Sequence, residues 1–305
     1  MAIVEAQCEV AGERAGRLDR IVQGLTERSR ADVRGLVDHG CVRLNGVTCT
    51  EPGTRVKAGD LVIVRHDPHI RYHETPRAWE NPAFGLIYED EHLIVVDKAA
   101  AVLTVPTDRW ETNTLLDAVN RYLSRRRHCR ASVVHRLDRG TSGLLVFGKD
   151  RRVAVELQAQ FRVRKAEREY AAIVAGMLTG PAGTFASRLG TTKSLQRYSV
   201  RPGADGERAV THYQVERQLR DATYVRVWLE TGRRNQIRVH FAEAGHPVLG
   251  DNRYRPNLAC HAAWKAKRLA LHAAVLGFEH PRTQRELRFE SPLPDEIARF
   301  LAKQG

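Results

Sequence analysis

The sequence predicts an α+β protein with two domains. Short runs of alternating or continuous apolar residues, separated by turn residues, recur between a few stretches of helical periodicity, and this mixture is typical of the α+β class. Residues 66–84 contain three prolines among polar residues and predict a linker. The linker separates a small domain at residues 16–65, preceded by an N-terminal segment at residues 1–15, from a larger domain at residues 85–305.

The chain is strongly basic. Its 305 residues include 49 Lys and Arg against 36 Asp and Glu, a formal net charge of +13. This balance favours a polyanionic partner, and the predominance of arginine favours nucleic acid over a membrane surface. A basic surface that serves only solubility remains the alternative.

The sequence contains no signal for a membrane, a disulfide framework or a metal site. It has no run of 18 apolar residues, and acidic residues stand near the N-terminus where a signal peptide would be apolar. We therefore expect a cytoplasmic protein. The five cysteines are widely spaced and form no C-x-x-C pair, which predicts inert thiols.

The small domain predicts two helices followed by a small sheet. Apolar spacing predicts a helix at residues 17–25, and Ser29 is placed to cap a second helix that Gly40 ends. Asn45-Gly46 predicts a tight hairpin turn between strands at 41–44 and 47–50, and residues 60–65 predict a last strand. Six arginines are distributed over these elements: Arg17, Arg20, Arg28, Arg30, Arg34 and Arg43.

The larger domain predicts strands interrupted by four helices. The predicted helices lie at residues 114–123, 150–161, 234–244 and 295–302. The predicted strands lie at residues 85–88, 93–96, 169–174, 210–219 and 224–230, with two more within 269–294. Residues 184–200 are weakly patterned and predict no element. The basic run at residues 125–128 predicts either a solvated helix end or a phosphate contact.

Residues 132–149 stand out as a strand, a polar loop with two glycines and a second strand. If the first run is extended, Val134, Arg136 and Asp138 lie on one face. An aspartate close to arginines stays ionised at neutral pH, so Asp138 is suited to act as a nucleophile or a charge stabiliser. The alternative is an ordinary salt bridge or a turn cap. We expect the glycines to let the backbone approach a substrate.

No motif for a nucleotide, dinucleotide or zinc site occurs, so a reaction here is expected to need no cofactor and no metal. The segment His135-Arg136-Leu137-Asp138-Arg139-Gly140-Thr141-Ser142-Gly143 resembles the signature loop of the RluA-type pseudouridine synthases. Four further stretches agree in family order: residues 93–98, residues 169–174, residues 231–240 and residues 245–251. Residues 16–65 resemble the small RNA-binding domain first described in a ribosomal protein, as in the RluC and RluD branches of that family.

The resemblance implies a catalytic domain built on a mixed, mainly antiparallel sheet flanked by helices, and a cofactor-free isomerase that converts uridine in RNA to pseudouridine. It implies that Asp138 is the essential carboxylate, that Arg238 pairs with it and that Tyr170 stacks on the uracil. Arg136 would hold the flipped nucleotide. The remaining implied RNA-binding residues are Arg139, Thr141, Lys98, Arg233, Gln236, Arg17, Arg30 and Arg43.

Large-subunit ribosomal RNA is the expected substrate by the same resemblance, acted on by a monomer. Transfer RNA is the second candidate, and a non-catalytic RNA-binding ribosome assembly factor is the alternative of another class. The chain departs from the family pattern at several positions. Lys98-Ala99-Ala100-Ala101 replaces Lys-Pro-Ala-Gly, Asn235 stands where histidine is common, and Arg255 stands where glycine is usual. These departures bear on loop geometry and substrate choice.

Overall fold

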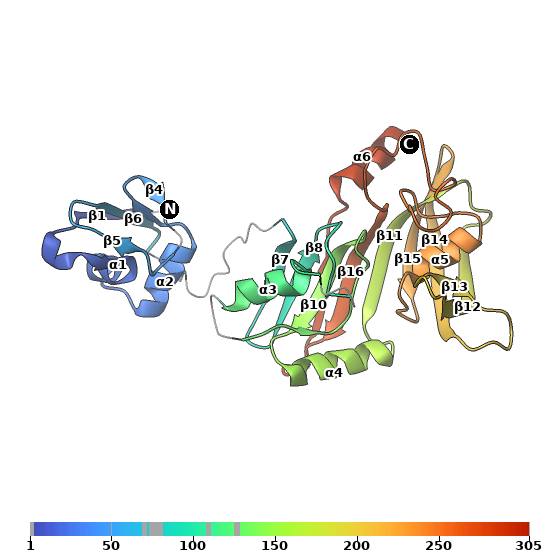
Figure 1. The fold of residues 1–305 in the computed structure, drawn as a ribbon, viewed down its shortest axis with the longest axis horizontal. Coiled ribbons are helices and arrows are strands. Elements are labelled where there is room, and N and C mark those ends of the chain that lie inside the picture. The colour runs from blue at the N-terminus through green and yellow to red at the C-terminus, as the bar shows by residue number, and fades with distance from the viewer. Residues whose placement is uncertain are drawn as a thin grey trace. The chain divides into compact units, whose positions relative to one another are not determined.

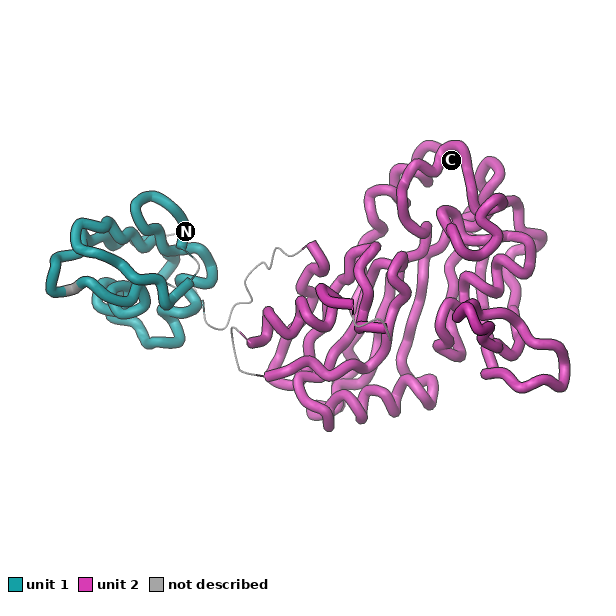
Figure 2. The backbone as a smooth tube through the Cα atoms, in the orientation of Figure 1, with its two compact units in different colours: residues 1–79 teal, residues 80–305 magenta. Residues whose placement is uncertain are grey.

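The computed structural model describes residues 3–49, 51–68, 72, 82–107, 111–124 and 129–304. By its internal contacts the chain divides into two compact units, residues 1–79 and residues 80–305 (Figure 2). Most of the predicted linker, and the basic run at residues 125–128, lie outside the described residues.

The first unit is a four-stranded sheet with two helices, in the strand order β1-β6-β3-β4 (Figure 1). The N-terminal segment, for which we predicted no element, supplies the edge strand β1, which pairs antiparallel with β6. The elements are β1 (Val4–Glu9), the 3-10 helix η1 (Gly12–Arg14), β2 (Gly16–Arg17), α1 (Leu18–Thr26), α2 (Arg30–Asp38), β3 (Val42–Leu44), β4 (Val47–Thr48), β5 (Arg55–Val56) and β6 (Leu61–His66).

The helix cap and the hairpin turn predicted for the small domain are confirmed. The Ser29 hydroxyl accepts a hydrogen bond from the Asp32 amide at 3.1 Å and so caps α2. Asn45 and Gly46 both have positive φ angles, 51° and 81°, as a two-residue hairpin turn requires. Between β3 and β6 on one side and the two helices on the other, a cluster of Val and Leu side chains forms the core of this unit.

The second unit is built on one mixed sheet of eleven strands, most of them antiparallel, as expected for the larger domain. Its strands are β7 (Phe84–Glu89), β8 (Leu93–Lys98), β9 (Ser132–Val133), β10 (Ser142–Gly148), β11 (Glu167–Ala175), β12 (Ala182–Thr191), β13 (Arg197–Ser199), β14 (Glu207–Leu219), β15 (Ala222–Leu229), β16 (Leu271–Glu279) and β17 (Glu286–Glu290). Its helices are α3 (Leu115–Ser124), α4 (Arg151–Arg162), α5 (Gln236–Glu243) and α6 (Asp295–Gln304).

Strand β16 occupies the middle of this sheet. The order along the main path is β13-β12-β14-β15-β11-β16-β10-β8-β7, so β16 joins a half made of β11 to β15 to a half made of β7, β8 and β10. It runs antiparallel to β11 and parallel to β10. Helix α4 packs on the second half, through Val153 and Leu157, whereas α5 lies against β13 and β14 of the first half (Figure 1).

Two of the sequence predictions for this unit are wrong. Residues 184–200 were predicted to form no element, but they contribute most of β12 and all of β13. Alternate side chains of β12 are exposed, so the strand needs few apolar residues and gives a weak pattern. The strand predicted before Asp138 is confined to Ser132–Val133. Residues 134–141 run as an irregular segment, here named the Asp138 loop.

Candidate active site

The Asp138 loop is held by hydrogen bonds on both sides of the aspartate. Thr104, a buried residue, donates its hydroxyl to the Leu137 carbonyl at 2.8 Å and accepts the Leu137 amide at 3.2 Å. The Asp138 carbonyl accepts the Thr141 amide at 3.1 Å. Because the backbone around Asp138 is fixed by these bonds, its carboxylate projects into a cavity with 18 % of the side chain exposed.

The glycines of this segment allow close packing against neighbouring parts of the second unit, and their expected role in the approach of a substrate stays a prediction. Gly143 has a φ of +113°, and a Cβ built there would lie 2.2 Å from the carbonyl oxygen of Ala273 on β16. A Cβ on Gly140 would lie 2.9 Å from Leu269. The absence of these side chains lets the start of β10 lie directly against β16. Ala273 on β16 also pairs with Tyr170 of β11. The contact between Gly143 and Ala273 therefore sets the spacing of Asp138 and Tyr170.

Arg238 lies on α5 and binds two aspartates. Its Nη1 is 3.6 Å from Asp138 Oδ2, while Nε and Nη2 donate to the two carboxylate oxygens of Asp251 at 2.7 and 2.9 Å. Burial acts to lower the pKa of the guanidinium, but Asp251, with a smaller effect from Asp138, raises it above its ordinary value. Arg238 is therefore a permanent cation with one nitrogen directed at Asp138.

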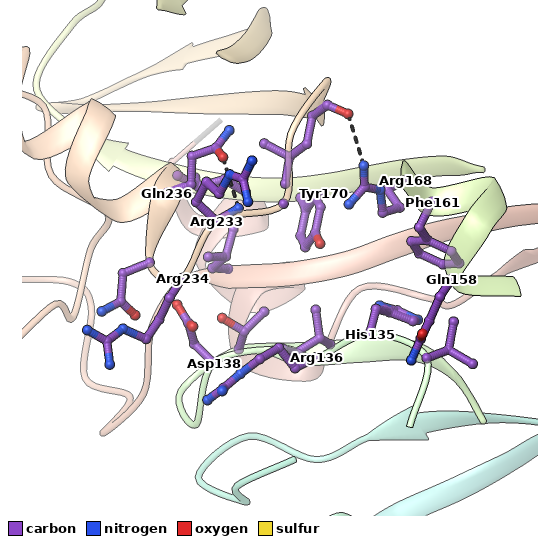
Figure 3. A pocket seen from close by; sticks show the side chains of 18 of the residues that line it. His135, Arg136, Asp138, Gln158, Phe161, Arg168, Tyr170, Arg233, Arg234 and Gln236 are labelled. Atoms are coloured by element: carbon purple, nitrogen blue, oxygen red, sulfur yellow. Dashed lines mark hydrogen bonds between the residues drawn. The ribbon is translucent and has the colours of Figure 1, made fainter. Parts of the chain in front are cut away.

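Tyr170 lies near the start of β11, next to a bulge between Glu169 and Tyr170 in its pairing with β16. Its side chain is 7 % exposed and lines the same cavity as Asp138 (Figure 3). Burial raises the pKa of its hydroxyl, so the phenol stays protonated at neutral pH. Its ring is available as a flat apolar surface beside the carboxylate.

The cavity has a volume of about 300 Å³ and a strongly positive wall. Among the described residues that line it, Asp138 is the one carboxylate and five are arginines: Arg136, Arg162, Arg168, Arg233 and Arg234. Within the described part of the chain, Arg136 has no hydrogen-bond or ion-pair partner, and Figure 3 shows its side chain beside that of Asp138. The volume and charge suit one nucleoside with its phosphates.

The far end of the cavity is aromatic. His135 stacks on Phe161 with ring centroids 4.5 Å apart. The Arg168 guanidinium also lies over the Phe161 ring, 5.3 Å from its centroid. The His135 ring accepts the Val146 amide at 3.2 Å, and burial lowers its pKa to about 3. His135 is thus a neutral structural group of the wall, not an acid or base at neutral pH.

Lys98 does not fit its predicted contact with RNA. Its side chain is fully buried, and its ammonium donates to the carbonyls of Ala99 and Val102 at 2.8 and 2.7 Å. Burial lowers its pKa to about 7, although the charge of Asp138 acts in the opposite direction. The lysine ties the loop after β8 together, and a positive charge that cannot reach the surface cannot contact a phosphate.

The other predicted residues fall into two groups. Gln236 is buried, and its carbonyl oxygen accepts from the Thr231 hydroxyl at 2.8 Å and the Arg233 amide at 3.0 Å, so it shapes the turn that presents Arg233 to the cavity. Thr141 is also buried at the cavity wall. Arg139 is exposed and donates to the Ala101 carbonyl at 3.1 Å.

The predicted arginines of the first unit belong to a separate surface. Arg30 and Arg43 are exposed, and Arg17 is exposed and bonds to Asp19 at 2.7 Å.

Three residues that hold Arg238 were not predicted. Asp251 has no exposed side-chain surface and also accepts the Arg253 and Tyr254 amides. Asn235 accepts from Arg238 Nη1 at 2.9 Å, and Tyr254 lies against the guanidinium, 5.1 Å from its ring centroid. Asp251 was noted only as part of a matching stretch. It follows Arg238 by thirteen residues across a loop, where no periodicity could link the two.

Two of the departures from the family pattern fall at strained backbone positions. Ala101 has a φ of +67° and Arg255 a φ of +48°, in the left-handed region where glycine has no steric cost. Asn235 has a φ of +57°, and asparagine tolerates this conformation better than most residues. The loops keep the shape that a glycine allows although Ala101 and Arg255 carry a Cβ.

Neither a metal centre nor a membrane helix is found in the described residues. No group of three or more His, Cys, Asp or Glu side chains there is arranged to hold a metal ion. None of the helices described is both long and apolar enough to cross a membrane.

The chain is similar to two known protein families and to proteins of known function. The family of RNA pseudouridylate synthases matches residues 92–243, and the S4 domain family matches residues 16–62. The ribosomal large subunit pseudouridine synthase D of Vibrio cholerae is 35 % identical over 294 residues, covering 92 % of this chain and 89 % of that protein. The synthase D of Pseudomonas aeruginosa is 33 % identical, covering 98 % and 96 %.

The fold is likewise shared with a solved structure. The human RNA pseudouridylate synthase domain containing 4 superimposes with a TM-score of 0.59 at 24 % identity, covering 72 % of this chain and 92 % of that one. With the two sequence relatives aligned along almost their whole length, the chain belongs to the RNA pseudouridine synthases, isomerases that act on uridine in RNA.

Proposed function

We propose that this protein converts specific uridines of large-subunit ribosomal RNA to pseudouridine, with Asp138, Tyr170 and Arg238 as its catalytic residues. The observation that carries the proposal is the cavity in which a single carboxylate, paired with a buried arginine, faces a tyrosine ring within a wall of arginines. The choice of ribosomal RNA is supported by the two relatives named above.

The reaction moves one bond. The bond from ribose C1′ to uracil N1 breaks, the uracil turns within the cavity, and C1′ bonds to C5, after which the proton on C5 is lost and N1 gains a proton. Asp138 acts in this sequence on the ribose or on the base. The substrate and the product are isomers, so the reaction needs no oxidant or reductant.

Arg238 and Tyr170 prepare Asp138 and the base for this step. The cation lies 3.6 Å from Asp138 and directs its carboxylate towards the cavity. The Tyr170 ring gives the detached uracil a surface on which it can stack while it turns. Because the tyrosine is protonated, it brings no second negative charge beside the carboxylate.

The target uridine must leave its stack before it can enter the cavity, at a cost of a few kcal/mol. Stacking on Tyr170 returns about 1 to 3 kcal/mol. Arg136, exposed at the mouth and without a protein partner in the described residues, holds the vacated RNA strand. The exposed arginines Arg30 and Arg43 of the first unit bind phosphates elsewhere on the same RNA, so binding weakens steeply with salt.

Release of tritium from C5-labelled uridine tests the function. The wild-type protein should release tritium from a large-subunit ribosomal RNA transcript, whereas Asp138→Asn should release none and still bind the RNA. Arg233→Gln, at the cavity wall, should weaken binding without abolishing release. Retention of all tritium by the wild type on ribosomal and transfer RNA would leave only the non-catalytic assembly factor.

Sequencing of pseudouridine in cells with and without the protein tests the substrate. We expect the missing sites to lie in large-subunit ribosomal RNA, and sites lost only from transfer RNA would replace that substrate with the second candidate. We further propose that the protein acts as a monomer in the cytoplasm, and light scattering of the purified chain tests the first part.

A further inference from the structure

The catalytic arginine is connected to a surface hairpin more than forty residues before it in the chain. Strands β12 and β13 form this hairpin, and residues 192–196 are its tip, all of them exposed. Tip side chains include Lys193 and Leu195, the latter 52 % exposed. The hairpin lies against α5, the helix that carries Arg238.

One hydroxyl links the hairpin to the support of Arg238. The Tyr254 hydroxyl accepts a hydrogen bond from the Arg197 amide, at the start of β13, at 3.2 Å. It accepts a second from Asn235 Nδ2 at 3.1 Å. The other end of the Asn235 amide accepts Arg238 Nη1 at 2.9 Å, the same nitrogen that lies 3.6 Å from Asp138.

The tip itself is tied to both loops that flank Arg238. Arg234 donates to the Leu195 carbonyl at 3.0 Å and Arg253 to the Ser194 carbonyl at 3.3 Å. These bonds use only backbone carbonyls of the tip, so the side chains of Lys193 and Leu195 remain available to the RNA. A displacement of the tip therefore reaches the two loops and, through Tyr254, the nitrogen that faces Asp138.

The base of the hairpin is fixed to α5 independently. Glu243 accepts from the Ser199 amide at 2.8 Å and from its hydroxyl at 2.5 Å, and His240 bonds to Ser187 at 3.0 Å. These bonds hold the base against α5 separately from the bonds that Arg197 and Tyr254 make nearer the tip. The linkage is short and each step is a single hydrogen bond.

We propose that Tyr254 is a positioning residue that couples the hairpin tip to Arg238, so that contact of the tip with RNA aligns the Arg238–Asp138 pair. The inference rests on the proposed function, because it concerns the regulation of that same site. Tyr254 is not among the residues that line the cavity. It acts through Asn235, and its ring supports the guanidinium from the side.

The substitution Tyr254→Phe isolates the hydroxyl, because it keeps the ring against Arg238 and removes both hydrogen bonds. We expect kcat for tritium release to fall about tenfold with KM within about twofold of wild type, because a misaligned pair affects the bound complex rather than binding. The matched control is Tyr213→Phe. Tyr213 is a buried tyrosine packed against Phe241 of α5, and its hydroxyl has no partner among the described residues, so both constants should be unchanged.

Two further variants test the route. Asn235→Gly suits the positive φ at this position and removes the middle link, so adding Tyr254→Phe to it should lower kcat little further. Arg253→Met cuts one tie of the tip without contacting Arg238, and should lower kcat in the same direction. Thermal unfolding of each variant near the wild-type temperature separates misalignment from misfolding.

The outcomes are distinct. If Tyr254→Phe and Arg253→Met both keep the wild-type kcat, or if the effects of Tyr254→Phe and Asn235→Gly multiply, the coupling is wrong while the proposed function stands. A rise in KM with an unchanged kcat would also overturn the coupling, since the hairpin would then only bind RNA. If the wild-type protein releases no tritium at all, the proposed function fails first.

Discussion

Two histidines of the second unit, the partly buried His135 and the buried His240, should make it lose stability in mild acid. Burial lowers the pKa of His135 to about 3 and that of His240 to about 4. Each neutral ring makes hydrogen bonds in the folded state. His135 accepts the Val146 amide. The two nitrogens of His240 bond to the Thr211 and Ser187 hydroxyls. Protonation in the folded state is therefore unfavourable.

The sign and size of this stability change follow from the protonation of the folded and unfolded states. In the unfolded chain a histidine titrates near pH 6.5, so between pH 6.5 and the folded pKa the unfolded state binds a proton that the folded state does not. The free energy of unfolding then falls as the pH falls. At pH 5 each histidine costs about 2 kcal/mol relative to pH 8, and the two together about 4 kcal/mol.

Urea unfolding followed by tryptophan fluorescence measures this loss, since Trp228 and Trp264 both lie in the second unit. His135→Gln and His240→Gln should each recover about 2 kcal/mol of the difference between pH 8 and pH 5. At pH 8 both rings are neutral in both states, so the same curves report any loss of packing in the variants. If both variants lose as much stability as wild type between the two pH values, the argument from buried neutral rings is refuted.

Three further predictions concern the backbone and Lys98. Ala101→Gly and Arg255→Gly should each raise the free energy of unfolding by about 0.5 to 1 kcal/mol, because they relieve positive φ angles, and urea unfolding that shows a loss would contradict this. Gly143→Ala should cost about 4 kcal/mol or more and abolish tritium release, because its Cβ meets the backbone of β16; Gly85→Ala, with open space around it, is the control and should be tolerated. Wild type should gain stability relative to Lys98→Met as the pH rises from 7 to 10. The reason is that the lysine of the unfolded chain then keeps a proton that the buried lysine has lost. Parallel plots of unfolding free energy against pH for the two proteins would exclude this.

The sequence predicts best what is decided locally. The cap at Ser29, the Asn45-Gly46 turn and most helix positions follow from short-range signals, and the structure confirms them. A family resemblance identified Asp138, Tyr170 and Arg238 as candidate site residues. In the structure Asp138 and Tyr170 line one cavity, and Arg238 lies 3.6 Å from Asp138. Their catalytic roles remain a proposal.

What could not be predicted depends on contacts between distant parts of the chain. The sequence reports the charge of Lys98 but not that the side chain is fully buried, with its ammonium on the carbonyls of Ala99 and Val102. It shows Gly143 in a loop but not that Ala273, far along the chain, lies against it. The support of Arg238 by Asp251 and Tyr254 likewise arises only when the loop after α5 folds back.

The central position of β16 has a consequence for how an active molecule is made. Asp138 belongs to the half of the sheet with β10, whereas Tyr170 and Arg238 belong to the half with β11 to β15, and β16 is the strand that joins the halves. During synthesis this strand leaves the ribosome after all the others of the main path. Pairings so distant in sequence form slowly, so the nascent chain passes through a stage in which both halves are present and catalysis is impossible. A chain that stops before Leu271 should bind RNA through its first unit and modify nothing.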